Sequence, residues 1–240
     1  MIDLHSHILP GVDDGARSLQ EARDLALAAA AEGVEAIAAT PHVRSDYPTR
    51  AERMELGVAE LRRDFANEGI AVEILHGGEI ELGRLWEIPH GELVRLSLGQ
   101  TGRYVLLEFP YRGWPPAAKS AIYTLRDIGM TPLLAHPERN PAVQDHPERL
   151  QSLVETGAAV QITAASLDGR LGRASQKAAA RLLELGLVHV LASDAHGPHI
   201  RASGLGAAAG QLGDPALARY LTTEAPAAIV RGDAVPPFPS

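Results

Sequence analysis

Short runs of apolar and β-branched residues alternate along this chain with longer stretches in which apolar residues recur at helical spacing. The short runs predict seven strands, at residues 2–4, 36–39, 71–75, 104–108, 131–135, 158–162 and 188–192. The longer stretches predict helices at residues 18–32, 50–67, 117–128, 147–155 and 173–185. This alternation indicates an α/β protein with a mainly parallel sheet, which is either open and doubly wound or closed into a barrel.

Residues that begin and end helices support these boundaries. Ser18, three residues before Glu21, fits a capping box at a helix start. A glycine stands one or two residues after the end of each predicted helix, at positions 33, 69, 129, 157 and 186, where a helix C-cap belongs. The helix–glycine–strand unit thus recurs five times without a Pro/Gly/Ser-rich linker, and we expect a single domain over residues 1–240.

Composition narrows the possible functions. The 240 residues include no cysteine, which excludes disulfides, zinc–cysteine sites, iron–sulfur clusters and a thiolate nucleophile. The 22 Lys and Arg residues against 30 Asp and Glu give a formal charge of −8, and they form no basic run. An acidic chain without such a run is a poor candidate for binding nucleic acid through its backbone.

The apolar pattern does not point to a membrane. The start of the chain, residues 1–5, lacks the basic and long apolar regions of a signal peptide. The longest helix-like apolar stretch, residues 25–31, is much shorter than the roughly 20 residues that a membrane span requires. We therefore expect a cytoplasmic protein that does not insert into membranes.

Residues that can bind metal ions follow six of the seven predicted strands. They are His5, His7, Asp13, Asp14, His42, His76, Glu79, Glu108, His136, Asp194 and His196. The exception is the strand at 158–162, where Gln161 and Thr163 offer no strong ligand. Because the carboxyl ends of barrel strands converge on one active site, we expect these distant residues to be neighbours.

The residue types point to a metal centre. Histidines and carboxylates without thiolates suit Mn²⁺, Fe²⁺ or Zn²⁺. Alternate positions on extended backbone direct His5 and His7 to the same side. A single histidine of this kind is more often structural, and Asp13-Asp14-Gly15 alone is typical of a turn. His76 is a candidate for a residue that holds a metal ligand in place without binding the metal itself. The histidines expected to be structural or solvated are His90, His146, His189 and His199.

Taken in order, the motifs resemble the polymerase-and-histidinol-phosphatase (PHP) superfamily, from residue 2 to about residue 205. More closely, the chain is similar to the manganese-dependent protein-tyrosine phosphatases of bacterial capsular and exopolysaccharide operons. The motifs that carry the resemblance are His5-Ser-His7-Ile-Leu-Pro-Gly-Val-Asp-Asp14-Gly, Ala-Thr-Pro-His42, Gly-Glu79-Ile, Leu-Glu108-Phe-Pro, Ala-His136-Pro-Glu-Arg139 and Ser-Asp194-Ala-His196.

The resemblance implies a distorted (β/α)7 TIM-like barrel with its metal site at the C-terminal ends of the strands. It further implies three divalent metal ions, with Mn²⁺ expected and Fe²⁺, Co²⁺ or Zn²⁺ as alternatives. The nine implied ligands fall into three sets: His5, His7 and Asp194; Glu108 and His136, with Glu79 bridging to the first set; and Asp14, His42 and His196.

The resemblance also implies the chemistry, which is that of a protein-tyrosine-phosphatase in which a hydroxide between two metal ions attacks phosphorus directly. Arg139 and Arg201 stand where the family holds the substrate phosphate, and Asp194 or a metal-bound water is the candidate proton donor to the leaving phenolate. The implied substrate is the phosphorylated Tyr-rich tail of a cognate bacterial tyrosine kinase, in the control of capsular or exopolysaccharide synthesis.

Two other interpretations remain open. The same site in a deep, lidded pocket suits a small metabolite such as histidinol phosphate, and residues 82–100 are a candidate lid. A non-catalytic, metal-stabilised docking module is disfavoured, because all nine implied ligands are present. The pattern carries no information on oligomeric state.

Overall fold

Two parallel sheets form the centre of the protein, whose computed structural model describes residues 1–197 and 202–239. The first sheet has the order β1–β2–β4, and the second has the order β3–β5–β6–β7–β8–β9. The strands are β1 (Ile2–Ser6), β2 (Ala36–Ala39), β3 (His42–Val43), β4 (Glu73–His76), β5 (Glu79–Glu81), β6 (Tyr104–Glu108), β7 (Thr131–Ala135), β8 (Ala159–Thr163) and β9 (Val190–Ala192).

The two sheets also meet between β1 and the segment that follows β9. The amide of Asp194 donates to the carbonyl of His5 at 2.9 Å, and the amide of His7 donates to that of Ala195 at 2.8 Å. Within the described residues the strand ladders nevertheless form two sheets and not one closed ring. The predicted α/β class is confirmed, and the seven-stranded barrel stays a prediction.

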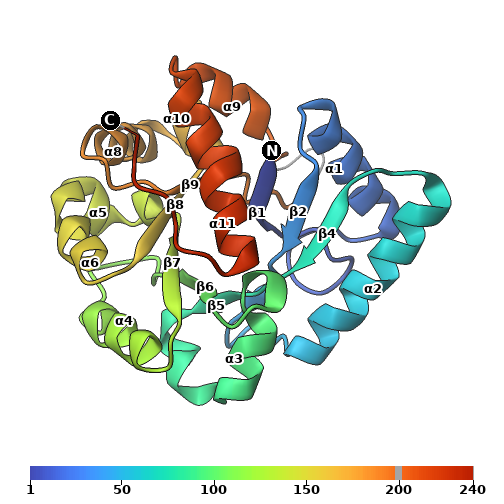
Figure 1. Ribbon diagram of the computed structural model, residues 1–240, viewed down its shortest axis with the longest axis horizontal. Coiled ribbons are helices and arrows are strands. Elements are labelled where there is room, and N and C mark those ends of the chain that lie inside the picture. The colour runs from blue at the N-terminus through green and yellow to red at the C-terminus, as the bar shows by residue number, and fades with distance from the viewer. Residues whose placement is uncertain (198–201, 240) are drawn as a thin grey trace.

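Helices surround the strands on the outside, and α11 crosses them near the start of β1 (Figure 1). The helices are α1 (Leu19–Ala31), α2 (Ala51–Glu68), α3 (His90–Leu96), α4 (Ala118–Asp127), α5 (Pro141–Asp145), α6 (Gln151–Glu155), α7 (Ala164–Leu167), α8 (Arg173–Glu184), α9 (Leu205–Gln211), α10 (Pro215–Arg219) and α11 (Ala225–Arg231). Short 3-10 segments cover Leu82–Glu87, Leu98–Gln100, Pro137–Arg139 and Pro147–Leu150, and one π-helical turn covers Tyr220–Glu224.

The buried apolar residues form two layers. An outer layer lies between the strands and the surrounding helices, and Phe65 of α2 and Leu182 of α8 belong to it. An inner layer takes alternate residues from strands of both sheets, such as Leu4, Leu75 and Leu133, because successive side chains of a strand point to opposite faces. Ile229 of α11 also belongs to this inner layer.

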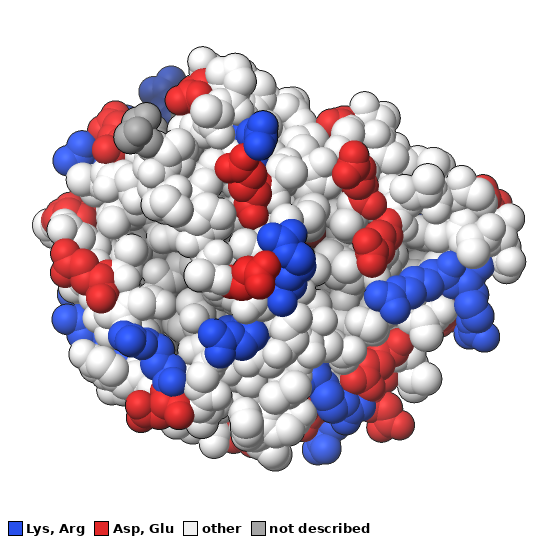
Figure 2. Space-filling model, in the orientation of Figure 1, with Lys and Arg blue, Asp and Glu red and all other residues white. Residues whose placement is uncertain are grey.

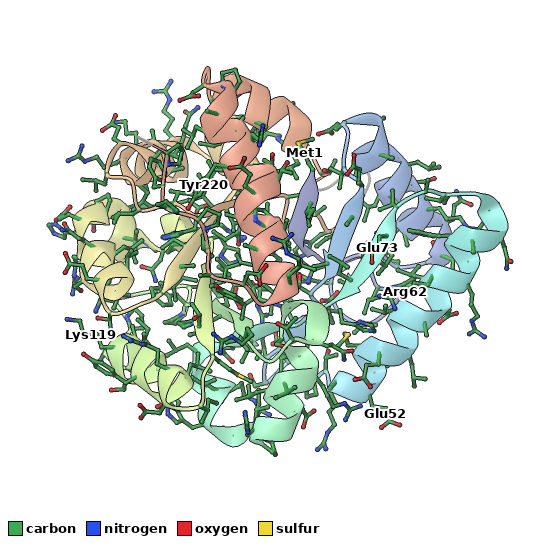
Figure 3. All side chains as sticks on the ribbon, viewed as in Figure 1. Met1, Glu52, Arg62, Glu73, Lys119 and Tyr220 are labelled. Carbon is green, nitrogen blue, oxygen red and sulfur yellow. The ribbon has the colours of Figure 1, made fainter. Side chains whose placement is uncertain are left out.

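The C-terminal segment is fixed against the body of the protein. The buried ring of Tyr220, labelled in Figure 3, meets Phe238 edge to face, and its hydroxyl donates to the carbonyl of Pro236 at 3.0 Å. The hydroxyl of Tyr104 donates to the carbonyl of Asp233 at 2.7 Å. These two anchors hold residues 233–238 along the protein, on the side where β6 begins.

The predicted elements match the structure closely, but the prediction did not include the helices α3, α5, α7, α9, α10 and α11 or two short strands. All seven predicted strands are present, and their ends agree within two residues. Four of the five predicted helices agree within one residue at each end, and the fifth, 147–155, begins as a 3-10 turn. The pattern missed β3 and β5, which are two and three residues long, because strands this short show no hydrophobic period.

Positively and negatively charged side chains alternate over the face of the protein seen in Figure 2, without a large patch of one sign. Among the residues that the structure describes, no helix is both long and apolar enough to cross a membrane.

Candidate metal centre

His5 at the end of β1 and His7 just after it form the centre of the candidate site. Both are completely buried, and their Nε2 atoms lie 3.2 Å apart. His5 Nδ1 donates to Gln161 Oε1 at 3.0 Å, and His7 Nδ1 donates to Asp13 Oδ2 at 2.7 Å. With a proton held on each Nδ1, both Nε2 atoms direct lone pairs to the same point, which is the usual orientation of metal-binding imidazoles.

Two carboxylates surround this pair of nitrogens. Asp194 places one oxygen, Oδ1, 3.4 Å from the Nε2 atoms of both histidines. Glu79 places Oε1 3.4 Å from Nε2 of His5 and Oε2 3.4 Å from Nε2 of His7. Burial alone would lower the pKa of His5, but the negative charges of Glu79 and Asp194 outweigh it, and the pKa is raised. The point between the four side chains therefore attracts positive charge, which a divalent cation supplies without a proton.

A second group of donors forms around Asp14. Its Oδ1 atom lies 3.4 Å from Nε2 of His42 and 3.4 Å from Nε2 of His196. Nδ1 of His196 donates to the backbone carbonyl of Asp194 at 2.9 Å, so its Nε2 carries the lone pair. The His7 ring lies next to both, with ring centroids 4.4 Å from His42 and 3.9 Å from His196. This group therefore adjoins the first.

Glu79 connects the remaining donors. One of its oxygens lies 2.8 Å from Nε2 of His136, and the other lies 2.8 Å from Nδ1 of His42, the residue beside it in the β3–β5 pairing. Burial and the charge of Glu79 raise the pKa of Glu108 to about 8. Ligand oxygens of Glu79 and Glu108 lie within 4.8 Å of one another. Two buried negative charges at this separation are unfavourable, and a bound metal ion offsets their repulsion and burial.

Two of the candidate ligands have an unusual backbone conformation. Asp194 has φ of 52° and His136 has φ of 34°, a region that residues other than glycine rarely adopt. One oxygen of Asp3 accepts from the amides of His5 at 3.3 Å and Ser193 at 3.0 Å, which fixes the turn that carries Asp194. Local strain of this kind is typical of functional sites.

The structure gathers all nine predicted ligands, and their donor atoms fall into four overlapping groups whose members lie within 4.8 Å of one another. The first and third predicted sets are each found together, whereas the second is divided, because Glu108 groups with Glu79 and His42. Buried imidazoles and carboxylates without sulfur fit Mn²⁺, Fe²⁺ or Zn²⁺. The groups are His5, His7 and Asp194; His5, Glu79 and His136; His42, Glu79 and Glu108; and His7, Asp14, His42 and His196.

Arg139 is the predicted phosphate-binding residue that the structure describes. It ends the 3-10 turn after His136, and its Nη1 atom donates to Asp194 Oδ2 at 2.5 Å. The guanidinium therefore lies against the candidate metal centre with most of its side chain buried. The second predicted arginine, Arg201, and His199 lie outside the described residues.

Other predictions about single residues can also be compared with the structure. His146 is solvated, and His189 accepts a hydrogen bond from the amide of Val160, as expected for residues outside the site. His76 belongs to none of the ligand groups among the described residues. Residues 82–100, the candidate lid, form the connection from β5 to β6, with Leu93 and Leu96 buried in the outer layer. The segment is thus a crossover that packs on the outer layer, and its role as a lid stays a prediction.

Sequence reasoning missed residues that support the ligands. Asp13, a candidate ligand in the sequence, instead accepts a hydrogen bond from His7, and Gln161, which offers no strong ligand, accepts one from His5. A signal for Gln161 was present, because a polar side chain inside a buried strand needs a hydrogen-bond partner. Arg44 carried no such signal, and it lies 3.8 Å from Glu108.

The fold and the site together define an α/β protein with a histidine–carboxylate centre at the carboxyl ends of parallel strands. The family model for capsular polysaccharide synthesis, CpsB/CapC, matches residues 1–229. The chain belongs to this family.

Several proteins named as tyrosine-protein phosphatases have similar sequences. The chain is 39% identical to tyrosine-protein phosphatase YwqE of Bacillus subtilis over 197 residues, which cover 82% of this chain and 77% of the relative. It is 31% identical to tyrosine-protein phosphatase CpsB of Streptococcus pneumoniae over 207 residues, covering 82% and 83% of the two chains.

Solved structures are also similar. One from a crystallographic study of YwqE from Bacillus subtilis and CpsB from Streptococcus pneumoniae, described as metal-dependent tyrosine phosphatases, has a TM-score of 0.86 at 34% identity. It covers 100% of this chain and 99% of the other. A β-aspartyl dipeptidase from Fervidobacterium islandicum, at 14% identity and a TM-score of 0.58, shares the fold, covering 100% of this chain and 76% of its own.

Proposed function

We propose that this protein is a metal-dependent phosphatase that hydrolyses phosphotyrosine in proteins and regulates capsular or exopolysaccharide synthesis. The observation that carries the proposal is the convergence of nine histidines and carboxylates, all buried except Asp14, in four overlapping groups beside Arg139. Membership of the CpsB/CapC family and the similarity to relatives named tyrosine-protein phosphatases support the choice of substrate.

The site would hold three divalent ions, with Mn²⁺ expected and Fe²⁺, Co²⁺ or Zn²⁺ as alternatives. The nine grouped residues would bind them, with Glu79 shared between two ions, as its contacts on both sides suggest. Bound ions of this kind supply an activated water nucleophile and positive charge for the phosphoryl oxygens. Three such ions would outweigh the four ligand carboxylates, giving an acidic protein one positive pocket.

Arg139 would hold the substrate phosphate. Its Nη1 atom donates a hydrogen bond to Asp194 Oδ2 at 2.5 Å, which fixes the position of the guanidinium. The other N–H groups of the guanidinium are suited to bind phosphate oxygens. Burial favours the neutral form of Asp194, but His5 and Arg139 are among the groups that outweigh it, and the pKa is held well below its usual value. Asp194 is therefore better suited to be a ligand and an anchor than a proton donor. Arg201 is proposed as the second phosphate-binding residue.

The wider proposal follows the family. Residues 1–240 would form one domain, a distorted (β/α)7 barrel, which the shared inner apolar layer and the contact between Ser6 and Ala195 support. The protein would act in the cytoplasm on the phosphorylated Tyr-rich tail of a bacterial tyrosine kinase. The packed crossover at 82–100 favours an open site for such a tail over a lidded metabolite pocket.

Substrate competition tests this proposal. The Mn²⁺-loaded protein is assayed with a tyrosine-rich phosphopeptide and with histidinol phosphate at equal concentrations, by phosphate release. We expect a clear excess of kcat/KM for the phosphopeptide, and the Glu79→Gln variant should lose turnover because Glu79 contacts four histidines. Faster hydrolysis of histidinol phosphate would contradict the proposed substrate.

A further inference from the structure

Three side chains form a rim beside the candidate centre, which we call the aromatic rim: Arg44, Tyr47 and Tyr111. The Arg44 guanidinium lies 5.7 Å from the ring centroid of Tyr47 and 5.5 Å from that of Tyr111. Its Nη1 atom donates to the hydroxyl of Tyr111 at 2.7 Å. Arg44 thus connects two aromatic rings that are 64 positions apart in the sequence.

The rim directly contacts the candidate ligands. The ring of Tyr47 stacks on His42 with a centroid distance of 5.8 Å and an interplanar angle of 22°. Arg44 Nη1 lies 3.8 Å from Glu108 Oε2. Tyr111 also lines a small hollow together with Glu108 and Arg139. A group bound through its phosphate at Arg139 would therefore have Tyr111 at its side.

The rim is held in position before any substrate arrives. Asp46 accepts two hydrogen bonds from Arg44, at 2.9 and 2.5 Å, and the Arg44 side chain is only 15% exposed. Tyr111 itself is 59% exposed. An exposed ring that is fixed by a buried guanidinium is available to contact another ring at little entropic cost.

We propose that the aromatic rim contacts the phenyl ring of the phosphotyrosine substrate and selects aryl over alkyl phosphate esters. This inference rests on the proposed function and specifies which residues select the substrate class. Aromatic rings pair favourably in offset or edge-to-face arrangements, and a guanidinium on a ring face adds to that attraction. An alkyl ester such as phosphoserine has no ring to place there.

Two inhibitors that share a phosphonate group test the proposal. Phenylphosphonate carries the ring and methylphosphonate lacks it, and each is titrated against hydrolysis of a phosphotyrosine peptide by the Mn²⁺-loaded protein. An aromatic contact of about 1 to 1.5 kcal/mol corresponds to a five- to tenfold change, so Tyr111→Leu should raise Ki for phenylphosphonate by about that factor. Ki for methylphosphonate should stay within about twofold.

Matched variants separate a ring contact from other effects. Tyr123→Leu on α4 is the control, because Tyr123 is 56% exposed and lies outside the rim. Tyr111→Phe keeps the ring and should keep most of the preference for phenylphosphonate. Equal losses for both inhibitors in Tyr111→Leu, no loss for either, or a loss in Tyr111→Phe as large as in Tyr111→Leu would overturn the proposal.

A failure of the aromatic-rim proposal can be distinguished from a failure of the proposed phosphatase function. If the wild-type protein does not release phosphate from the phosphotyrosine peptide with Mn²⁺ present, the proposed function is wrong. If it does, and the phenylphosphonate Ki of Tyr111→Leu equals that of Tyr123→Leu, only the role of the aromatic rim is wrong.

Discussion

The Nε2 atoms of His5 and His7 face one another across 3.2 Å, completely buried. Gln161 and Asp13 hold the proton of each ring on Nδ1, so two lone pairs meet with the carboxylates of Glu79 and Asp194 beside them. Such a cluster is unfavourable unless a cation lies within it. The local structure thus predicts metal binding independently of any relative.

Asp13 should be necessary for tight metal binding although it is not a ligand. It accepts from His7 Nδ1 at 2.7 Å and from the amide of His42 at 2.9 Å, so it orients two candidate ligands. Loss of a residue of this kind typically weakens metal affinity about 10- to 100-fold. We expect Asp13→Ala to show this loss in competition with a fluorescent chelator. Unchanged affinity, equal to that of exposed Asp127→Ala, would contradict the role.

Gly15 should accept no side chain. A Cβ atom at this position would lie 2.0 Å from the carbonyl oxygen and 2.4 Å from Cβ of His7. Gly15→Ala must therefore displace the loop that carries Asp13 and Asp14, and we expect reduced metal content in the purified protein. Gly91→Ala, where nothing lies within 4 Å, is the matched control. Metal content equal to that of the control would show that the loop adapts.

Arg139→Ala should reduce turnover and leave the metal ions in place. The guanidinium is proposed to bind the phosphate, and removal of one such donor costs about 100- to 1,000-fold in kcat. Arg149→Ala is the control, because Arg149 stacks on Trp114 at 4.2 Å and belongs to none of the ligand contacts described above. Steady-state kinetics and elemental analysis of the same sample check both statements. If the metal ions are lost as well, Arg139 maintains the site through Asp194 and is not primarily a phosphate-binding residue.

His189 should make stability depend on pH. Burial lowers its pKa, so the folded protein keeps this ring neutral, with Nδ1 accepting from the amide of Val160. The unfolded chain takes up the proton near pH 6.5, so this contribution to stability is present above that pH and is lost as the pH falls below it.

Thermal unfolding between pH 7.5 and 5.5 measures this effect. The loss of Tm on acidification should be smaller for His189→Gln than for the wild-type protein, and both proteins carry the same candidate ligands. His146→Gln is the control, since that side chain is 64% exposed. Parallel pH profiles for the wild-type protein and His189→Gln would refute the assignment.

Local sequence was sufficient for most of the fold. β6 and β7 were predicted at their observed bounds, because a fully buried strand is a continuous apolar run that ends where polar residues begin. The glycines after the helices were also informative: those at 33, 69, 129, 157 and 186 all have positive φ. Candidate ligands were recognised because they lie at or after the ends of predicted strands, and the resemblance to the PHP superfamily implied which nine of them bind metal.

What the sequence could not reveal depends on contacts between distant positions. Gln161 reaches His5 across 156 positions, and Arg44 reaches Tyr111 across 67. Neither pair has a spacing that periodicity can detect. The pairing of β3 with β5, which sets His42 beside Glu79, is too short to appear in a hydrophobic pattern and forms only because the surrounding sheets position it.

Metal dependence of phosphotyrosine hydrolysis tests the central claim most directly. The protein is stripped with a chelator, Mn²⁺ is added back stepwise, and bound metal and phosphate release from a tyrosine phosphopeptide are measured in the same samples. We expect no turnover in the stripped protein and full recovery as the bound Mn²⁺ approaches three ions per chain. Full turnover by protein without detectable bound metal would contradict the account.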